Sequence, residues 1–322
     1  MNCKFYLHKG KGQKAILGHP WIFSGEIMGY DGEYTNGDIV DVYTNEGKFI
    51  GKGYINDASL ITIRILTRDI NEEIDKEFFR RKLHLAWDYR KKEGMELTKG
   101  FLTAPFDTNI IIEENGVKYH VDIENGQKTG FFLDQKENRK AIHKICKDAE
   151  VIDICTHTGS FALNAGIAGA KHVIGVDISQ HAVNNCRENA KLNNLEDTVE
   201  FICEDAFEAL NNFYHQGKKF DVVILDPPAF TKSRDTIKAA QKGYKKLNFR
   251  GLKVVKDGGY LVTASCSHFM SPELFKKAIA DAARDAGKIL RQVEFKTQAP
   301  DHPILWNDDE SYYLKFYIFQ VL

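Results

Sequence analysis

The sequence predicts an α/β protein with an open, mostly parallel sheet in its C-terminal part and a smaller β-rich domain before it. From residue 126 on, short β-branched runs alternate with segments of helical periodicity, as in a parallel sheet with helices on its faces. Residues 1–70 instead contain short alternating runs separated by Gly, Asn and Asp turns. Four of the C-terminal runs carry an aspartate at or near their end: 151–159, 172–179, 199–207 and 220–230.

The acids at these ends predict a binding crevice, because ligands of open parallel sheets bind outside the carboxyl ends of the strands. A fifth run, 258–268, ends in Cys266 and brings a thiol to the same edge. Any single acid here could instead be a helix N-cap. The four together favour an adenosine-type cofactor beside a nucleophilic thiol: Asp153, Asp177, Asp205 and Asp226.

Composition sets the broad class. The chain has 322 residues, is 43% hydrophobic and carries a net charge of −1, which suits a globular protein of two or three domains. The six cysteines show no zinc spacing, so we expect no metal. Without a signal peptide or long apolar span, we expect a cytoplasmic protein that makes no membrane contact. The oligomeric state stays open, with a homodimer as one alternative.

Three regions divide the chain: 1–70, 71–125 and 126–322. The first is expected to form a small β-barrel, with Trp21 and Phe23 packed in its core. Its basic cluster is either an RNA contact or a solvated loop: Lys9, Lys11 and Lys14.

The second region predicts a helix within 73–94, ending at Gly94, and a hairpin over 109–123 that turns at Asn115-Gly116. In the third region, the strand candidate 311–322 follows a loop, so we expect it to join the sheet antiparallel. The helices expected in this region are 134–147, 160–170, 180–194 and 271–287.

Two loops refine the chemistry. The turn after Asp153 has one glycine, Gly159, where the dinucleotide fingerprint needs three, so a cofactor without phosphates fits better than NAD. Asp177 ends the second strand, where an acid can accept hydrogen bonds from ribose hydroxyls. Asp226-Pro227-Pro228 forms a stiff loop that can aim a carboxylate at a planar base.

The motifs together resemble the S-adenosylmethionine-dependent large-subunit ribosomal RNA methyltransferases, the cytosine-C5 enzymes with an N-terminal PUA domain. The resemblance implies a class I, Rossmann-like methyltransferase domain after a PUA-like barrel. One departure is that the helix near 75–90 runs straight into KKEGMEL, where the family has a β-rich stretch, so the central α+β segment is short or truncated. The matching segments are 19–27, 91–100, 128–139, 151–165, 176–179, 226–230, 265–268 and 301–304.

The resemblance also implies cofactor-binding roles. Asp153 and Gly159 would shape the cofactor turn, and Asp177 would bind the ribose. Ile178 would be a further cofactor-binding residue. Asp205 and Ala206, with Phe207, would hold the adenine. Asp226 would complete the site, with Gln135 and Arg139 on one helix face. Arg139 would pair with the cofactor's carboxylate.

The implied catalytic pair is Cys266 and Asp226. Thiolate addition at C6 of cytosine makes C5 nucleophilic enough to take a methyl group, and Asp226 would hydrogen-bond N3 or N4 of the base. The group that removes the C5 proton is unidentified. The implied partner is large-subunit ribosomal RNA.

A basic run, 231–256, follows the Asp-Pro-Pro loop with nine Lys or Arg against one acid, Asp235. We expect it to contact RNA phosphates through Lys242, Lys245 and Lys246. Tyr244 and Phe249 could stack on unpaired bases. The alternative is a solvated helix face.

Two other functions stay open. The Asp-Pro-Pro loop also resembles that of enzymes that methylate an exocyclic amine, adenine N6 or guanine N2, and these need no thiol. The chain could also be a non-enzymatic RNA-binding protein with a vestigial cofactor fold. Cys266 and the intact acids argue for the cytosine-C5 function.

Overall fold

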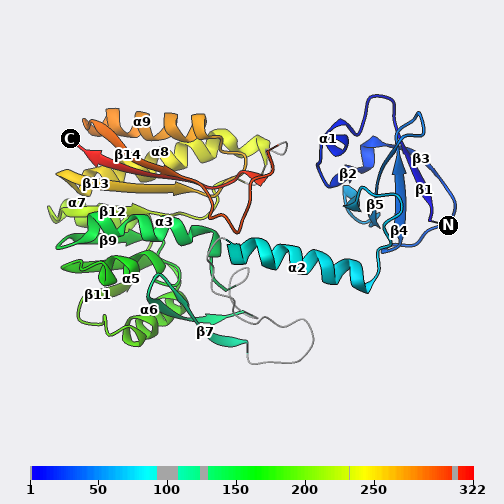
Figure 1. Cartoon of the computed structure of the whole chain (residues 1–322). Helices are drawn as coiled ribbons and strands as arrows, with labels where there is room; N and C mark the ends of the chain where they lie inside the picture. The colour runs from blue at the N-terminus through cyan, green and yellow to red at the C-terminus, as the bar shows by residue number, and fades with distance from the viewer. Residues whose placement is uncertain (1, 93–107, 124–129, 232, 307–310) are drawn as a thin grey trace. The chain divides into compact units, whose positions relative to one another are not determined.

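The computed structural model describes residues 2–92, 108–123, 130–231, 233–306 and 311–322. The chain forms two compact units, one of residues 1–98 with 304–311 and one of residues 99–303 with 312–322 (Figure 1). The expected helix end at Gly94 and most of the 91–100 motif lie outside the described residues. The three-region division given above stays a prediction.

The first unit contains a six-stranded sheet in the order β2-β6-β5-β4-β1-β3. Its neighbouring strands are antiparallel, except that β1 and β4 run parallel. Gly53 lies where two strands approach closely, since a Cβ there would meet the carbonyl oxygen of Arg64 at 2.1 Å. The strands are β1 Lys4–Leu7, β2 Trp21–Phe23, β3 Ile27–Asp31, β4 Ile39–Tyr43, β5 Phe49–Ile55 and β6 Ile61–Thr67.

The core of this unit corrects one expectation. Ile22 is fully buried, whereas Trp21 and Phe23 on either side of it are only half-buried. Successive side chains of a strand point to opposite faces, so only one of the two sets can enter the core. The aromatic pair therefore lies on the outer face of β2.

Helix α2, Lys76–Lys92, confirms the helix expected after the sheet. Its first turn is capped by Asp75, whose carboxylate accepts a hydrogen bond from the Phe78 backbone N–H at 2.7 Å. Phe78 is buried, while Phe79, Leu83 and other apolar side chains of the helix are exposed.

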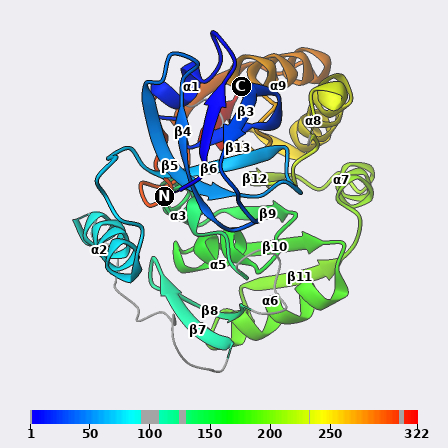
Figure 2. The ribbon, with the colours of Figure 1, turned by 90° about the vertical axis from the view of Figure 1, so that its right-hand side faces the viewer.

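The second unit contains a seven-stranded sheet in the order β11-β10-β9-β12-β13-β15-β14, part of which is visible in Figure 2. Five strands run parallel, and β15 joins antiparallel between β13 and β14, which confirms the predicted fold class. Strand β14 was not anticipated. The strands are β9 Glu150–Ile154, β10 His172–Asp177, β11 Val199–Cys203, β12 Phe220–Leu225, β13 Val255–Ser265, β14 Leu290–Lys296 and β15 Lys315–Val321.

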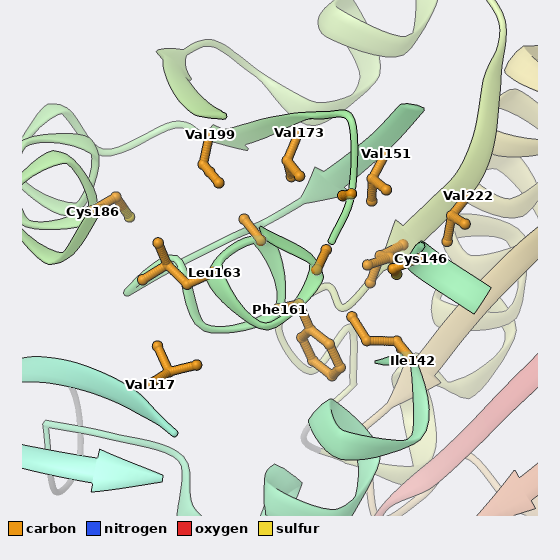
Figure 3. Close-up of a cluster of buried hydrophobic side chains, with 14 of the residues drawn as sticks. Val117, Ile142, Cys146, Val151, Phe161, Leu163, Val173, Cys186, Val199 and Val222 are labelled. Atoms are coloured by element: carbon orange, nitrogen blue, oxygen red, sulfur yellow. The ribbon is translucent and has the colours of Figure 1, made fainter. Parts of the chain in front are cut away.

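Helices cover both faces of this sheet, so its central strands are apolar throughout and do not alternate. On one face, Val151 and Val173 of the strands pack with Phe161 and Leu163, as Figure 3 shows. That face is covered by α5 Ser160–Ile167 and α6 Gln180–Leu192, and the other by α7 Ala206–His215, α8 Ile237–Val254 and α9 Pro272–Ala286.

The predicted hairpin is present. Strands β7, Asn109–Glu114, and β8, Val117–Asp122, are antiparallel, and Asn115 and Gly116 both have positive φ, as a two-residue turn requires. The helix expected over 134–147 is divided into η2 Leu133–Gln135, α3 Lys136–Ala141 and α4 His143–Cys146. No helix in the described part of the chain is long and apolar enough to cross a membrane.

Candidate active site

Parallel strand order brings the predicted acids to one edge of the sheet. Asp153 and Asp177 lie at the ends of the neighbouring strands β9 and β10. Asp205 follows β11 and Asp226 follows β12, the strands on either side of that pair. Burial raises the pKa of the Cys155 thiol, and the carboxylates of all four aspartates raise it further. All four acids therefore lie near enough to Cys155, directly after β9, for their charges to act on its thiol. Sequence reasoning missed Cys155, because a cysteine after a buried strand looks like an inert core residue.

Asp153 fastens the turn between β9 and α5. Its Oδ2 accepts hydrogen bonds from Thr156 Oγ1 at 2.6 Å and from the Ala162 backbone N–H at 3.0 Å. Its Oδ1 has no hydrogen-bond partner among the described residues. Burial raises the pKa of Asp153 to about 7, against the effect of those two hydrogen bonds. One oxygen of the carboxyl thus stabilises the turn, and the other can accept a hydrogen bond from a ligand.

Asp177 is half-buried at the end of β10. Its two oxygens accept hydrogen bonds from the His157 N–H at 3.0 Å and the Ser179 N–H at 2.9 Å. Gly159 begins α5 with φ 78°, and a Cβ there would lie 3.0 Å from the Phe201 ring. The glycine therefore keeps this turn close to the strands.

Asp205 serves as an N-cap. Its Oδ1 accepts hydrogen bonds from the N–H groups of Phe207, at 2.8 Å, and Glu208, at 3.2 Å. This is the alternative role that any one of the acids could fill. Ala206 starts the capped helix, and Ile178 is 72% exposed beyond β10. The proposed contacts of these three residues with a cofactor stay predictions.

Asp226 accepts hydrogen bonds from a residue of the helical segment that precedes β9. Both of its carboxylate oxygens accept from Gln135 Nε2, at 3.1 and 3.0 Å, and Gln135 Oε1 in turn accepts from Asn138 Nδ2 at 2.6 Å. Burial raises the pKa of Asp226 to about 7, and the nearby carboxylates of Asp153 and Asp134 add to the shift. Asp226 can therefore exist in both protonation states near neutral pH.

Arg139 pairs with a carboxylate of the chain itself, and its contact with the cofactor stays a prediction. Its guanidinium is 1% exposed and ion-pairs with Glu114, with Nε–Oε1 at 2.5 Å and Nη2–Oε2 at 2.9 Å. It also donates to the Phe132 carbonyl at 2.8 Å and lies over the Phe131 ring. These contacts tie the hairpin to α3. Residue spacing identified the helix face but not the strand packed against it.

Cys266 follows β13 and is half-buried. Its sulfur lies 4.0 Å from the Pro227 carbonyl oxygen in the Asp-Pro-Pro loop. The serines on either side of it, Ser265 and Ser267, hydrogen-bond the Tyr244 hydroxyl at 3.0 and 2.9 Å. The predicted catalytic pair thus lies on adjacent loops, and the cysteine loop is held by a buried tyrosine.

The basic run requires a second correction. Tyr244 is fully buried against Phe230 and Phe275, so it cannot stack on an RNA base. It lies on the inner face of α8, which the charge count alone does not distinguish from the outer face. Phe249 is half-buried against the core. The outer face keeps Lys242 and Lys246 exposed, while Lys245 pairs with Asp285 at 2.6 Å.

The basic cluster of the first unit is at the surface: Lys9, Lys11 and Lys14 are all exposed. Two of them lie in the loop after β1, and Lys14 lies on the short helix α1, Gln13–Ile16. Nothing in their contacts distinguishes an RNA contact from a solvated loop, so the RNA role stays a prediction.

The strand edge fits a nucleoside cofactor without phosphates. Four carboxylates at one edge would repel a pyrophosphate and attract a cationic group. Two buried polar atoms at this edge, Asp153 Oδ1 and His157 Nδ1, have no hydrogen-bond partner in the described part of the chain. An open sheet with these features defines a nucleoside-cofactor enzyme of the doubly wound α/β type.

Comparison with known proteins gives the family. Residues 5–68 match the model of a PUA-like domain, and residues 75–319 match that of an S-adenosylmethionine-dependent methyltransferase. Proteins named ribosomal RNA large subunit methyltransferase I from Shigella dysenteriae and Aeromonas salmonicida are 32% and 34% identical, over 100% and 98% of both chains. The chain belongs to the S-adenosylmethionine-dependent methyltransferases and, within them, to the family of these relatives. Its cofactor is S-adenosyl-L-methionine.

Solved structures agree on the fold. A methyltransferase crystallised with SAH has a TM-score of 0.83 at 17% identity, covering 99% of this chain and 100% of that one. An S-adenosylmethionine-dependent methyltransferase from Streptococcus mutans has a TM-score of 0.81 at the same identity and coverage. The alignment with the Shigella relative runs over 396 positions, more than the 322 residues of this chain. The relative therefore carries residues that this chain lacks.

Proposed function

We propose that this enzyme methylates C5 of a cytosine in large-subunit ribosomal RNA through a covalent bond between Cys266 and C6. Support for the RNA comes from the names of the relatives at 32–34% identity. Support for the chemistry comes from one observation, the position of Cys266 at the strand edge beside the Asp-Pro-Pro loop. The cofactor supplies the methyl group.

In the proposed reaction, the Cys266 thiolate adds to C6 of the ring, and the electron pair of the C5–C6 double bond becomes available at C5. C5 would then form the new bond to the methyl carbon, while the bond from that carbon to the sulfonium sulfur breaks and its electron pair stays on sulfur. Loss of the C5 proton then restores the double bond and expels the thiolate from C6. Asp226, with a pKa of about 7, can donate or accept a hydrogen bond at N3 or N4 of the base.

Two half-buried cysteines lie at this edge, and their electrostatic surroundings differ. Cys155 is near four carboxylates, which disfavour its thiolate. Cys266 is close enough to the buried Lys315 for the two charges to interact favourably. The neighbours therefore distinguish the two thiols, because carboxylates lie near Cys155 and an ammonium lies near Cys266.

The test is a Cys266→Ser variant assayed on ribosomal RNA from cells that lack the protein. We expect loss of methyl transfer with unchanged binding of cofactor and RNA, because a serine hydroxyl stays protonated near neutral pH. The native enzyme should form a denaturant-resistant complex with RNA that carries 5-fluorocytosine. Fluorine cannot leave C5 as a cation, so the covalent adduct accumulates.

Two cysteine variants serve as matched controls. Apart from Cys266, Cys155 and Cys203 are the cysteines of the second unit whose side chains are at least partly exposed. The variants Cys155→Ser and Cys203→Ser should both still form the trapped complex. Full activity in Cys266→Ser would overturn the cytosine-C5 proposal. It would favour methylation of an exocyclic amine, which needs only the Asp226 loop.

A further inference from the structure

Lys315 is a buried cation that the residue pattern did not single out. It is 1% exposed and begins β15, directly opposite Ser265 in the antiparallel pairing with β13. That register brings a residue from the far end of the chain next to the cysteine loop. A fully buried lysine is rare and requires partners for its ammonium group.

The partners of Lys315 are carbonyls. Its Nζ donates to the Ser267 carbonyl at 2.7 Å and to the Tyr313 carbonyl at 2.8 Å. No carboxylate of the described residues lies within ion-pair distance of it. An ammonium has three donors, so the charge is hydrogen-bonded but not neutralised. Burial lowers the pKa of Lys315 to about 8, and interaction with Cys266 opposes that shift.

We propose that Lys315 is a positioning residue that fixes the loop carrying Cys266 and stabilises the thiolate of that cysteine. The inference rests on the proposed nucleophile. The hydrogen bond from Lys315 to the Ser267 carbonyl fixes the backbone directly after Cys266. A fixed backbone restricts the directions in which the Cys266 sulfur can point. The positive charge acts on the sulfur itself, since an opposite charge nearby favours the ionised form.

Other titratable groups lie around the same loop, among them Asp226, which precedes the Pro227 whose carbonyl oxygen is 4.0 Å from the Cys266 sulfur. Tyr244 comes from α8, Tyr313 precedes β15, and His268 lies in the loop itself. Asp134 accepts a hydrogen bond from the Tyr313 hydroxyl at 2.8 Å, and Asp301 lies near that tyrosine. The tyrosines are neutral at physiological pH, because burial raises the pKa of both. Lys315 is the lysine that the strand register places beside the cysteine loop, opposite Ser265.

The experiment measures alkylation of Cys266 by iodoacetamide against pH, with the modified peptide quantified by mass spectrometry. In the native protein we expect a midpoint below about 8.5, the ordinary value for cysteine. In Lys315→Gln, which keeps a donor and loses the charge, we expect the midpoint to rise by about one unit. A midpoint at or above 8.5 in the native protein overturns the proposal even where the variants do not fold.

Tyr244→Phe is the matched control, because it removes the hydroxyl bonds to Ser265 and Ser267 but keeps the charge. It should change the rate of alkylation and leave its midpoint in place. If folded Lys315→Gln has an unchanged midpoint while the native protein forms the fluorocytosine complex, the role of Lys315 is refuted and the cytosine-C5 function is not. A shifted midpoint without any fluorocytosine complex in the native protein would instead refute the cytosine-C5 function.

Discussion

Asp177 shows how a single residue at a strand end can serve both the fold and a ligand. Its carboxylate accepts two backbone hydrogen bonds, from His157 and Ser179, and is still half-exposed. A carboxylate offers about four lone-pair directions, so two remain for ligand hydroxyls. Asp153, which is fully buried, has less access to a ligand.

We expect Asp177→Ala to weaken binding of S-adenosylmethionine at least roughly tenfold. Hydrogen bonds to a charged group are worth about 1.5–3 kcal/mol each, and about 1.4 kcal/mol is a factor of ten in affinity. Calorimetry measures the change. Asp197→Ala, at an exposed acid of the same unit, is the control. Equal affinity of the Asp177 variant and the native enzyme would remove Asp177 from the cofactor site.

What the sequence could not provide at this scale is a list of long-range partners. The acids were predictable because each follows a buried run and the topology of parallel sheets is regular. The Arg139–Glu114 pair joins residues from α3 and a hairpin strand, and no local pattern encodes it. Lys315 was missed for the same reason, since its neighbours in the cysteine loop come from a distant part of the chain.

Helix α8 illustrates the scale of elements. Its charge run was read from the sequence, but the helix has an inner face that buries Tyr244 and an outer face that carries the exposed lysines. The strands were easier to predict than the inner and outer faces of this helix, because sheet strands covered on both sides form continuous apolar runs. Strand β14 was missed since its exposed edge position leaves it with polar residues, such as Arg291 and Gln292.

We expect the triple change of Lys242, Lys245 and Lys246 to Ala to weaken RNA binding and to flatten its salt dependence. Each lost phosphate contact should reduce the slope of log affinity against log salt by about 0.7–0.9. Lys245 should contribute least, because Asp285 already pairs with it. Filter binding at several salt concentrations measures the slope.

Changing Lys276 and Lys277, two exposed lysines of α9, is the control for removal of charge alone. If the α8 triple variant binds RNA like the native enzyme at every salt concentration, the run is a solvated face. Cofactor affinity should be the same in all of these proteins.

At the scale of the whole molecule, the two units have separate cores. One buried cluster lies wholly within residues 3–65, and the other three are formed by residues 117–321. Separate cores favour separate unfolding transitions. A ligand that binds one folded unit stabilises that unit.

We therefore expect calorimetry to show two transitions, of which S-adenosylmethionine raises only one. At 100 times the Kd, the cofactor should add about 2.7 kcal/mol to the stability of the unit that binds it. Residues 2–70 expressed alone should unfold at the temperature of the unresponsive transition. A single transition that shifts as a whole with cofactor would contradict this expectation.

The place of β15 has a consequence for the order of assembly. Strand β14 precedes β15 in the chain, yet it reaches the sheet only through β15, which lies between it and β13. During synthesis, β14 therefore has no neighbour to pair with until residues 315–321 exist. The same late strand pairs Lys315 with Ser265, the residue before Cys266. A nascent chain would therefore have all five parallel strands of the crevice before Lys315 could reach the cysteine loop.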